Sequence, residues 1–197
     1  MNCLIFVGSP NKKAAPMQTA EALESRLKQQ GFETEIVWIN DLGITYNFCT
    51  KDTKKCLREY AGFCPYVYDD MTTLGDKIVA ADQFVFVSPI YSCFIPDVIQ
   101  SFLTRIIRGF CTFYGAERSE EFWGSKKVSF AAVCSFSPTK AAEAKFQKLM
   151  NDHCRQYNIF PDAILTLSRS LFSRFLNEKN LKKLDVFVSE ISSKSAA

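Results

Sequence analysis

The chain lacks long apolar runs and blocks of charge, and each absence excludes a class of protein. No apolar stretch reaches the roughly 18 residues that a membrane-spanning helix needs. Its 24 lysines and arginines are dispersed and the net charge is only +3, which argues against a nucleic-acid partner. The sequence begins directly with a predicted strand, without the pattern of a signal peptide. We therefore expect a cytoplasmic protein with neither a membrane nor a nucleic acid as its partner.

The sequence also lacks the residue spacing of a metal centre. Eight cysteines without a signal peptide do not indicate a disulfide framework. Only Cys49, Cys56 and Cys64 form a local group, and this group contains no C-x-x-C pair. A four-iron cluster needs four thiolates and zinc sites favour closer pairs, so these three are weak metal candidates. The single histidine, His153, falls on the apolar face of a predicted helix, where we interpret it as a packing residue.

What the sequence does contain is a pair of apolar segments that end alike. Residues 3–8 run into Ser9-Pro10, and residues 84–87 run into Ser88-Pro89. Each segment is too short for a helix and is typical of a strand that is buried on both faces. In an open parallel sheet, ligands bind just beyond the carboxyl ends of the strands. Two such ends with similar loop chemistry predict two walls of one pocket.

The apolar patterns alternate between strands and helices along the chain. The predicted strands are residues 3–8, 34–39, 83–87, 127–134 and 163–167, and the predicted helices begin near Pro16, Asp70, Pro96, Lys140 and Leu171, the last with a break near residues 177–180. This alternation predicts one α/β domain over residues 1–197, a flavodoxin-like doubly wound sheet of five parallel strands in the order 2-1-3-4-5. Residues 40–69 interrupt the pattern as an excursion, and residues 192–197 are interpreted as a frayed tail.

The loop after the first strand, residues 8–19, joins a buried strand to the start of a helix. A helix amino terminus offers unpaired backbone amides and the positive end of a dipole, both of which suit a phosphate. Ser9, Asn11, Gln18 and Thr19 add candidate side-chain donors. The loop lacks the Gly-Lys-Ser/Thr ending of a Walker loop and the glycines of a dinucleotide-binding turn. Its residues alone support a phosphate site and a plain strand–helix connection equally.

The loop after the third strand begins with Ser-Pro-Ile-Tyr-Ser at residues 88–92. Proline fixes φ and removes a backbone donor, which makes this turn stiff. A stiff loop with exposed amides can hold the edge of a planar ring, and Tyr91 can stack on the ring or shield it. The alternative is that Ile90 and its neighbours only cover the top of the sheet.

In their order and spacing, these motifs resemble the flavodoxin-like NAD(P)H-dependent FMN reductases and quinone reductases, including the iron–sulfur flavoprotein branch. That family has Gly-Ser-Pro-Arg-Lys after its first strand, and residues 8–12 here are Gly-Ser-Pro-Asn-Lys. It has Ser-Pro-Val-Tyr after its third strand, and residues 88–91 are Ser-Pro-Ile-Tyr. Residues 69–71 match its Asp-Asp-Met before the second helix. The resemblance covers roughly residues 2–160.

The resemblance implies a homodimeric FMN-dependent oxidoreductase that transfers hydride from NAD(P)H through the flavin to a quinone, a flavin or another small acceptor. No catalytic side chain is expected, because the flavin carries the chemistry. The implied cofactor-binding residues are Ser9, Asn11, Gln18 and Thr19 at the phosphate and Pro89, Ile90, Tyr91 and Ser92 at the ring.

The loops also depart from the family pattern. Asn11 stands where the family has arginine, Ala14, Ala15 and Pro16 replace side-chain donors, and residues 134–138 contain no glycine. A missing glycine can block the close approach of backbone to a ligand. Two other hypotheses therefore stay open, an electron carrier on the same fold and a flavin-free binding or regulatory member. The slightly basic charge disfavours the carrier, because flavodoxin-type carriers are strongly acidic.

Overall fold

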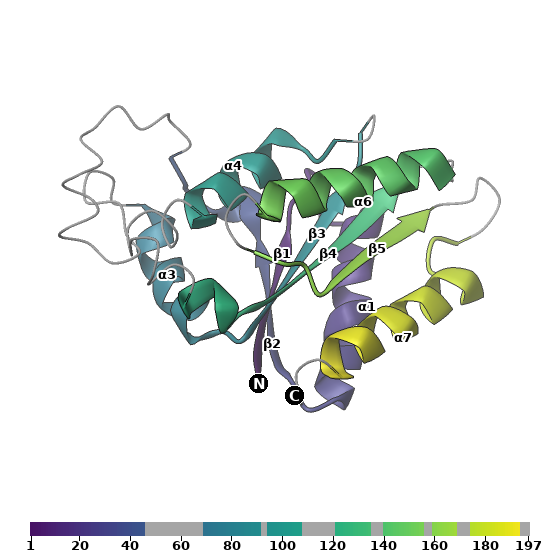
Figure 1. Cartoon of the computed structure of the whole chain (residues 1–197), viewed down its shortest axis with the longest axis horizontal. Coiled ribbons are helices and arrows are strands. Elements are labelled where there is room, and N and C mark those ends of the chain that lie inside the picture. The colour runs from purple at the N-terminus through teal and green to yellow at the C-terminus, as the bar shows by residue number, and fades with distance from the viewer. Residues whose placement is uncertain are drawn as a thin grey trace.

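The computed structural model places five parallel strands in one sheet, in the order β2-β1-β3-β4-β5, with helices on both faces (Figure 1). It describes residues 1–45, 69–91, 94–107, 121–134, 140–155, 159–168 and 174–193. The strands are β1 (Asn2–Val7), β2 (Glu33–Trp38), β3 (Gln83–Pro89), β4 (Lys127–Cys134) and β5 (Ala163–Ser168). The helices are α1 (Ala15–Gln29), α3 (Asp70–Ala80), α4 (Asp97–Ile107), α6 (Lys140–Arg155) and α7 (Glu178–Ser193). The predicted fold class and strand order are confirmed.

Two apolar layers hold the helices to the sheet. Helices α3, α4 and α6 pack on one face, and α1 and α7 pack on the other (Figure 1). Because successive side chains of a strand point to opposite faces and helices cover both faces, the central strands β1, β3 and β4 are buried along nearly their whole length and are mostly apolar. Phe6, Phe86 and Phe130 lie at paired register positions, and their ring centroids are 5.2 and 5.3 Å apart. These phenylalanines are core residues, and their stacked rings pack the three central strands β1, β3 and β4 against one another.

Gly8 lets the end of β1 lie close to α4. A Cβ at this position would stand 2.0 Å from the Cγ1 atom of Ile99, whose side chain is fully buried. The Gly8 amide donates to the Val87 carbonyl at 3.1 Å, which extends the pairing of β1 and β3 past the last strand residue. The two Ser-Pro ends are therefore held side by side, as the strand order predicts.

The described ends of the predicted excursion are clamped together. The Asp69 carboxylate accepts hydrogen bonds from the amides of Met71, as the cap of α3, and of Thr45, at 3.0 and 2.9 Å. Arg105 on α4 donates to the same carboxylate at 2.9 and 3.2 Å and to the Thr45 carbonyl. Residues 46–68 of the excursion, with Cys49, Cys56 and Cys64, lie outside the described residues.

The structure differs from the predicted elements at two places. Ile39 begins a short 3-10 turn, η1 (Ile39–Asp41), instead of ending β2, because the Leu42 amide bonds back to its carbonyl at 3.1 Å. The last helix begins at Glu178 rather than near Leu171, so residues 174–177 form a loop, and it continues through residues 192 and 193 of the predicted tail. None of the described helices is both long and apolar enough to span a membrane.

Candidate functional site

The ends of β1, β3 and β4 and the loop before α7 enclose a pocket of about 800 Å³. It lies at the carboxyl edge of the parallel sheet, where ligands bind in this class of fold. Its volume is within the range of small-molecule sites. Ser9 comes from the end of β1, Pro89 from the end of β3 and Cys134 from the end of β4. As predicted, residues from both Ser-Pro ends, Ser9 and Pro89, line the same pocket.

The β1–α1 loop contributes polar groups that are arranged by local hydrogen bonds. The Asn11 Oδ1 atom accepts from the Lys13 amide at 2.8 Å, and the Asn11 carbonyl accepts from the Ala14 amide at 3.1 Å. Both oxygens of Asn11 are thus occupied, and among the described residues its side-chain nitrogen has no partner and is left as a donor. Ser9 is buried, and its hydroxyl lies 3.4 Å from the Asn11 amide nitrogen and carbonyl oxygen.

Helix α1 begins at this pocket without a side-chain cap and without an acidic residue in its first turn. Pro16, at its start, has no backbone N–H to satisfy, and Ala14 and Ala15 bring no charge of their own. The positive end of the helix dipole is therefore not neutralised by the helix's own residues, a condition that favours an anion.

The two predicted donors further along this loop are placed differently. Gln18 lines the pocket, and its amide nitrogen lies 3.3 Å from the Lys13 carbonyl. Thr19 is fully buried against the sheet and does not line the pocket. Its hydroxyl donates to the Ala15 carbonyl one turn earlier, at 2.9 Å. The helical period separates these adjacent residues, because it turns Thr19 to the core face of α1.

The β3–α4 loop supplies Pro89 and Tyr91 to the pocket. The side chain of Ile90, which lies between them in the sequence, packs against the core layer under α3, α4 and α6. Its amide donates to the Val133 carbonyl at 2.9 Å. Tyr91 and Phe94 form an antiparallel bridge through mutual backbone hydrogen bonds of 2.9 Å, and they are 54% and 57% exposed. Ser92 lies outside the described residues.

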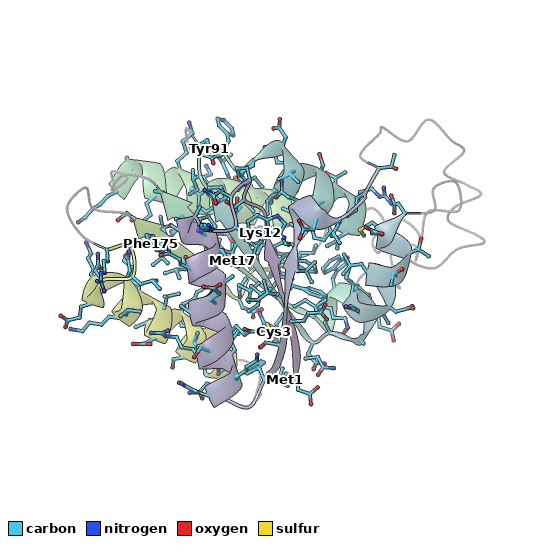
Figure 2. All side chains as sticks on the ribbon, turned by 180° about the vertical axis from the view of Figure 1, so that it is seen from behind. Met1, Cys3, Lys12, Met17, Tyr91 and Phe175 are labelled. Carbon is cyan, nitrogen blue, oxygen red and sulfur yellow. The ribbon has the colours of Figure 1, made fainter. Side chains whose placement is uncertain are left out.

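Tyr91 stands between two hollows. Besides the main pocket, it lines a second and more open one of about 530 Å³, together with Phe94 and the start of α4. Figure 2 shows Tyr91 above the first turn of α1, and Phe175 to one side of that helix. An exposed tyrosine at the boundary of two hollows can contact flat molecules on either side.

Sequence reasoning missed the third wall of the pocket, which Arg174, Phe175 and Leu176 form before α7. The apolar and basic pattern of residues 171–191 suggested a helix, and a helix would have carried these side chains elsewhere. Asn180 prevents this, because its side-chain nitrogen donates to the Phe175 carbonyl at 2.7 Å and to the Ser168 carbonyl at 2.9 Å. The break that the sequence predicts in this helix near residues 177–180 was the signal that could have revealed the loop.

The pocket carries positive charge. Lys13 and Arg174 line it, and none of its described lining residues is acidic. Lys12, next in sequence to Lys13, points elsewhere: it pairs with Asp41 and lies 5.4 Å from the centre of the Trp38 ring.

The family of the chain follows from its sequence as a whole. The model of the NADPH-dependent FMN reductase family matches residues 1–164. The chain belongs to this family. Membership makes it an oxidoreductase that uses FMN, with NAD(P)H as the electron donor. No curated protein matches the chain significantly.

Solved structures of this fold agree with the family assignment at low sequence identity. The NAD(P)H:quinone oxidoreductase of Methanothermobacter marburgensis superposes with a TM-score of 0.72 at 14% identity, over 95% of this chain and 94% of the other. An FMN-dependent NADH-azoreductase of Bacillus anthracis, in complex with FMN, has a TM-score of 0.63 at 11% identity, over 100% of both chains. An NADH:FMN oxidoreductase in its apo form has a TM-score of 0.64 at 15% identity, over 98% and 89%. At these identities the likeness concerns the fold.

The pocket of this FMN reductase family member fits the chemistry of FMN. An uncapped helix start, the side-chain nitrogen of Asn11 and two cations suit the phosphate, whereas Pro89, Tyr91 and Phe175 offer flat or apolar surface for a ring system.

Other reactive side chains of this family member lie away from the pocket. His153 is half-buried on α6, as predicted, and burial lowers its pKa below 6.5. Burial raises the pKa of the Cys3 and Cys154 thiols to about 12, so both are inert. Within the described ranges, no group of three or more histidine, cysteine or acidic residues is arranged to hold a metal.

Proposed function

We propose that the pocket beyond β1 and β3 binds FMN with the phosphate at the start of α1 and the ring system against the β3–α4 loop. The observation that carries this proposal is the combination, in one pocket of about 800 Å³, of an uncapped helix start, side-chain amide donors and two cations, with no acidic residue among the described lining residues. Asn11 donates from its side-chain nitrogen, Gln18 from its amide, and Ser9 from its buried hydroxyl after a small rotation.

Pro89 and Tyr91 flank the ring in this proposal. Pro89 keeps the loop rigid, because its ring fixes the backbone angle φ. Ile90 contributes by holding the loop in place, since its side chain packs in the core and its amide bonds the Val133 carbonyl. Ser92 remains a proposed contact at the polar edge. FMN, when bound, supplies the hydride chemistry, and the protein supplies position, electrostatics and exclusion of water. The apolar side chains of Val133 and Phe175 are placed to exclude water from the inner part of the pocket.

The second hollow, beyond Tyr91, is the proposed place for the acceptor. It is open and bounded by the exposed aromatic pair Tyr91 and Phe94, which suits a planar quinone or flavin. We also propose that the chain is a single domain over residues 1–197 and that the protein is cytoplasmic. It is further proposed to form a homodimer whose interface covers this aromatic pair. The exposed pair supports the dimer, because large exposed aromatic side chains are typical of interfaces.

The decisive experiment is titration of the purified protein with FMN, followed by anaerobic addition of NADPH or NADH. Stoichiometric FMN binding and loss of the flavin absorbance on reduction are expected. Failure to bind FMN would contradict both the oxidoreductase and the electron-carrier hypotheses and favour the flavin-free one. Binding without reduction by either nucleotide would favour the carrier.

Two adjacent lysines provide a matched test of the phosphate position. Lys13→Ala removes a cation that lines the pocket, whereas Lys12→Ala removes one that is paired with Asp41 outside it. Lys13→Ala is expected to weaken FMN binding about two- to fivefold, the range of an exposed ionic contact, and Lys12→Ala to leave it unchanged. Equal effects of both variants would place the phosphate elsewhere. Riboflavin, which has no phosphate, serves as the control ligand.

A further inference from the structure

One wall of the pocket is built by a segment beyond the part of the chain that the family model matches. The match ends at residue 164, whereas Arg174, Phe175 and Leu176 line the pocket from the loop before α7. In Figure 2 the labelled Phe175 marks this loop beside α1. The wall therefore lies outside the family match, and that match does not prescribe its side chains.

The loop is held in place firmly enough to position a side chain. Asn180, which is 2% exposed, bonds the carbonyls of Phe175 and Ser168, and the Asn177 side chain accepts from the Asn180 amide at 3.0 Å. Phe175 itself is buried in the core layer under α1 and α7. Arg174 therefore directly precedes a backbone position that Asn180 anchors, and ordering its side chain costs less than on a loose loop.

The charge of Arg174 is not compensated within the part of the chain that the structure describes. Arg174 is exposed and forms no ion pair with any described residue, and none of the described residues that line the pocket is acidic. In the β1–α1 loop, which lines the same pocket, Asn11 is uncharged and no arginine is present. A guanidinium offers a planar fork of donors that matches the oxygens of a phosphate.

We propose that Arg174 is the main cationic contact of the FMN phosphate, supplied from the loop before α7 in place of the arginine that the β1–α1 loop lacks. Arg174 thereby sets the preference of the pocket for phosphorylated flavin over riboflavin. This inference rests on the proposed function, because it takes FMN as the occupant of the pocket. The 2′-phosphate of NADPH has the same chemistry, and the experiment separates the two phosphates.

The test compares the dissociation constants of FMN and riboflavin in Arg174→Gln, in Arg174→Lys and in the control Lys179→Gln. Lys179 is an exposed cation on the first turn of α7 that does not line the pocket. Loss of a charge-assisted contact is expected to weaken FMN binding about 10- to 100-fold in Arg174→Gln. Riboflavin binding should stay unchanged, Arg174→Lys should recover part of the FMN affinity, and Lys179→Gln should behave like the unmodified protein.

Several outcomes would overturn the inference. Unchanged FMN affinity in Arg174→Gln, or equal losses for FMN and riboflavin, would show that Arg174 does not read the flavin phosphate. A rise of the KM for NADPH but not for NADH, with unchanged FMN binding, would assign Arg174 to the nucleotide phosphate instead. If the unmodified protein binds neither flavin, the proposed function itself fails, which is a result distinct from a defect confined to the variants.

Discussion

Replacement of Asp69 by alanine should destabilise the protein more than any neighbouring surface change. The Asp69 side chain is only 5% exposed, and its two oxygens accept four hydrogen bonds, from the amides of Met71 and Thr45 and from both terminal nitrogens of Arg105. Alanine would remove the cap of α3, release Thr45 and leave the Arg105 guanidinium, itself 19% exposed, without its counter-charge.

The magnitude follows from these contacts. Breaking a buried ion pair costs about 3–5 kcal/mol, because the remaining charge stays desolvated. Loss of a helix cap alone costs about 1 kcal/mol. Since Arg105 keeps some contact with water and its bond to the Thr45 carbonyl, we expect the lower end of the range, about 3 kcal/mol. Arg105→Met should remove most of this penalty when combined with Asp69→Ala, so the two changes should be less than additive.

The assay is urea unfolding followed by circular dichroism, with Asp70→Ala as the matched control. Asp70 is the adjacent carboxylate, but it is exposed and accepts one bond, from the Gly43 amide at 2.7 Å. The control should lose about 1 kcal/mol or less. If Asp69→Ala and Asp70→Ala agree within about 1 kcal/mol, or if the Asp69 and Arg105 effects are additive, the argument from the buried clamp is refuted.

Three further predictions concern packing and titration. Gly8→Ala should lower the free energy of unfolding by about 1–3 kcal/mol, because the new Cβ would stand 2.0 Å from a buried Ile99 atom. In urea unfolding, the same substitution should cost less when it is made in an Ile99→Ala protein. Burial lowers the pKa of His153 below 6.5, so the unfolded state takes up a proton first and stability falls as the pH drops below 6.5. His153→Gln should flatten that part of the pH profile, and identical profiles would contradict the assignment. The thiols of Cys3 and Cys154, with pKa values near 12, should be alkylated only after unfolding, as peptide mass mapping would reveal.

The elements of this fold were predictable because burial imposes short apolar runs on central parallel strands and a periodic face on the helices. The run that ends at Gly8 has the pattern of a strand buried on both sides, and Gly31, with its φ of 84°, lies just past the end of α1, where glycine is favoured. The start of α7 was misplaced, because residues 171–177 have the composition of a helix. Over residues 174–177 the contacts of Asn180 with the carbonyls of Phe175 and Ser168 decide against a helix.

The candidate site was predictable where it depends on strand ends and not where it depends on side-chain direction. Ser9 and Pro89 follow β1 and β3, so the topology alone brings them together. Gln18 and Thr19 are both polar and adjacent, yet one lines the pocket and the other bonds to its own helix. That difference arises from the angular position of each residue on α1, which needs the docked helix to be known.

By itself the sequence determined the parallel sheet and indicated its strand order and the edge at which a ligand is expected, because these follow from hydrophobic periodicity and the rules of parallel α/β folds. The tertiary structure decided which charged side chains face that edge. Lys12 and Lys13 are chemically alike, but Lys12 forms an ion pair with Asp41 outside the pocket, whereas Lys13 lines the pocket. Arg174 reaches the same pocket from 165 positions after Ser9, through a loop whose path is set by buried hydrogen bonds between residues that are separated in the sequence.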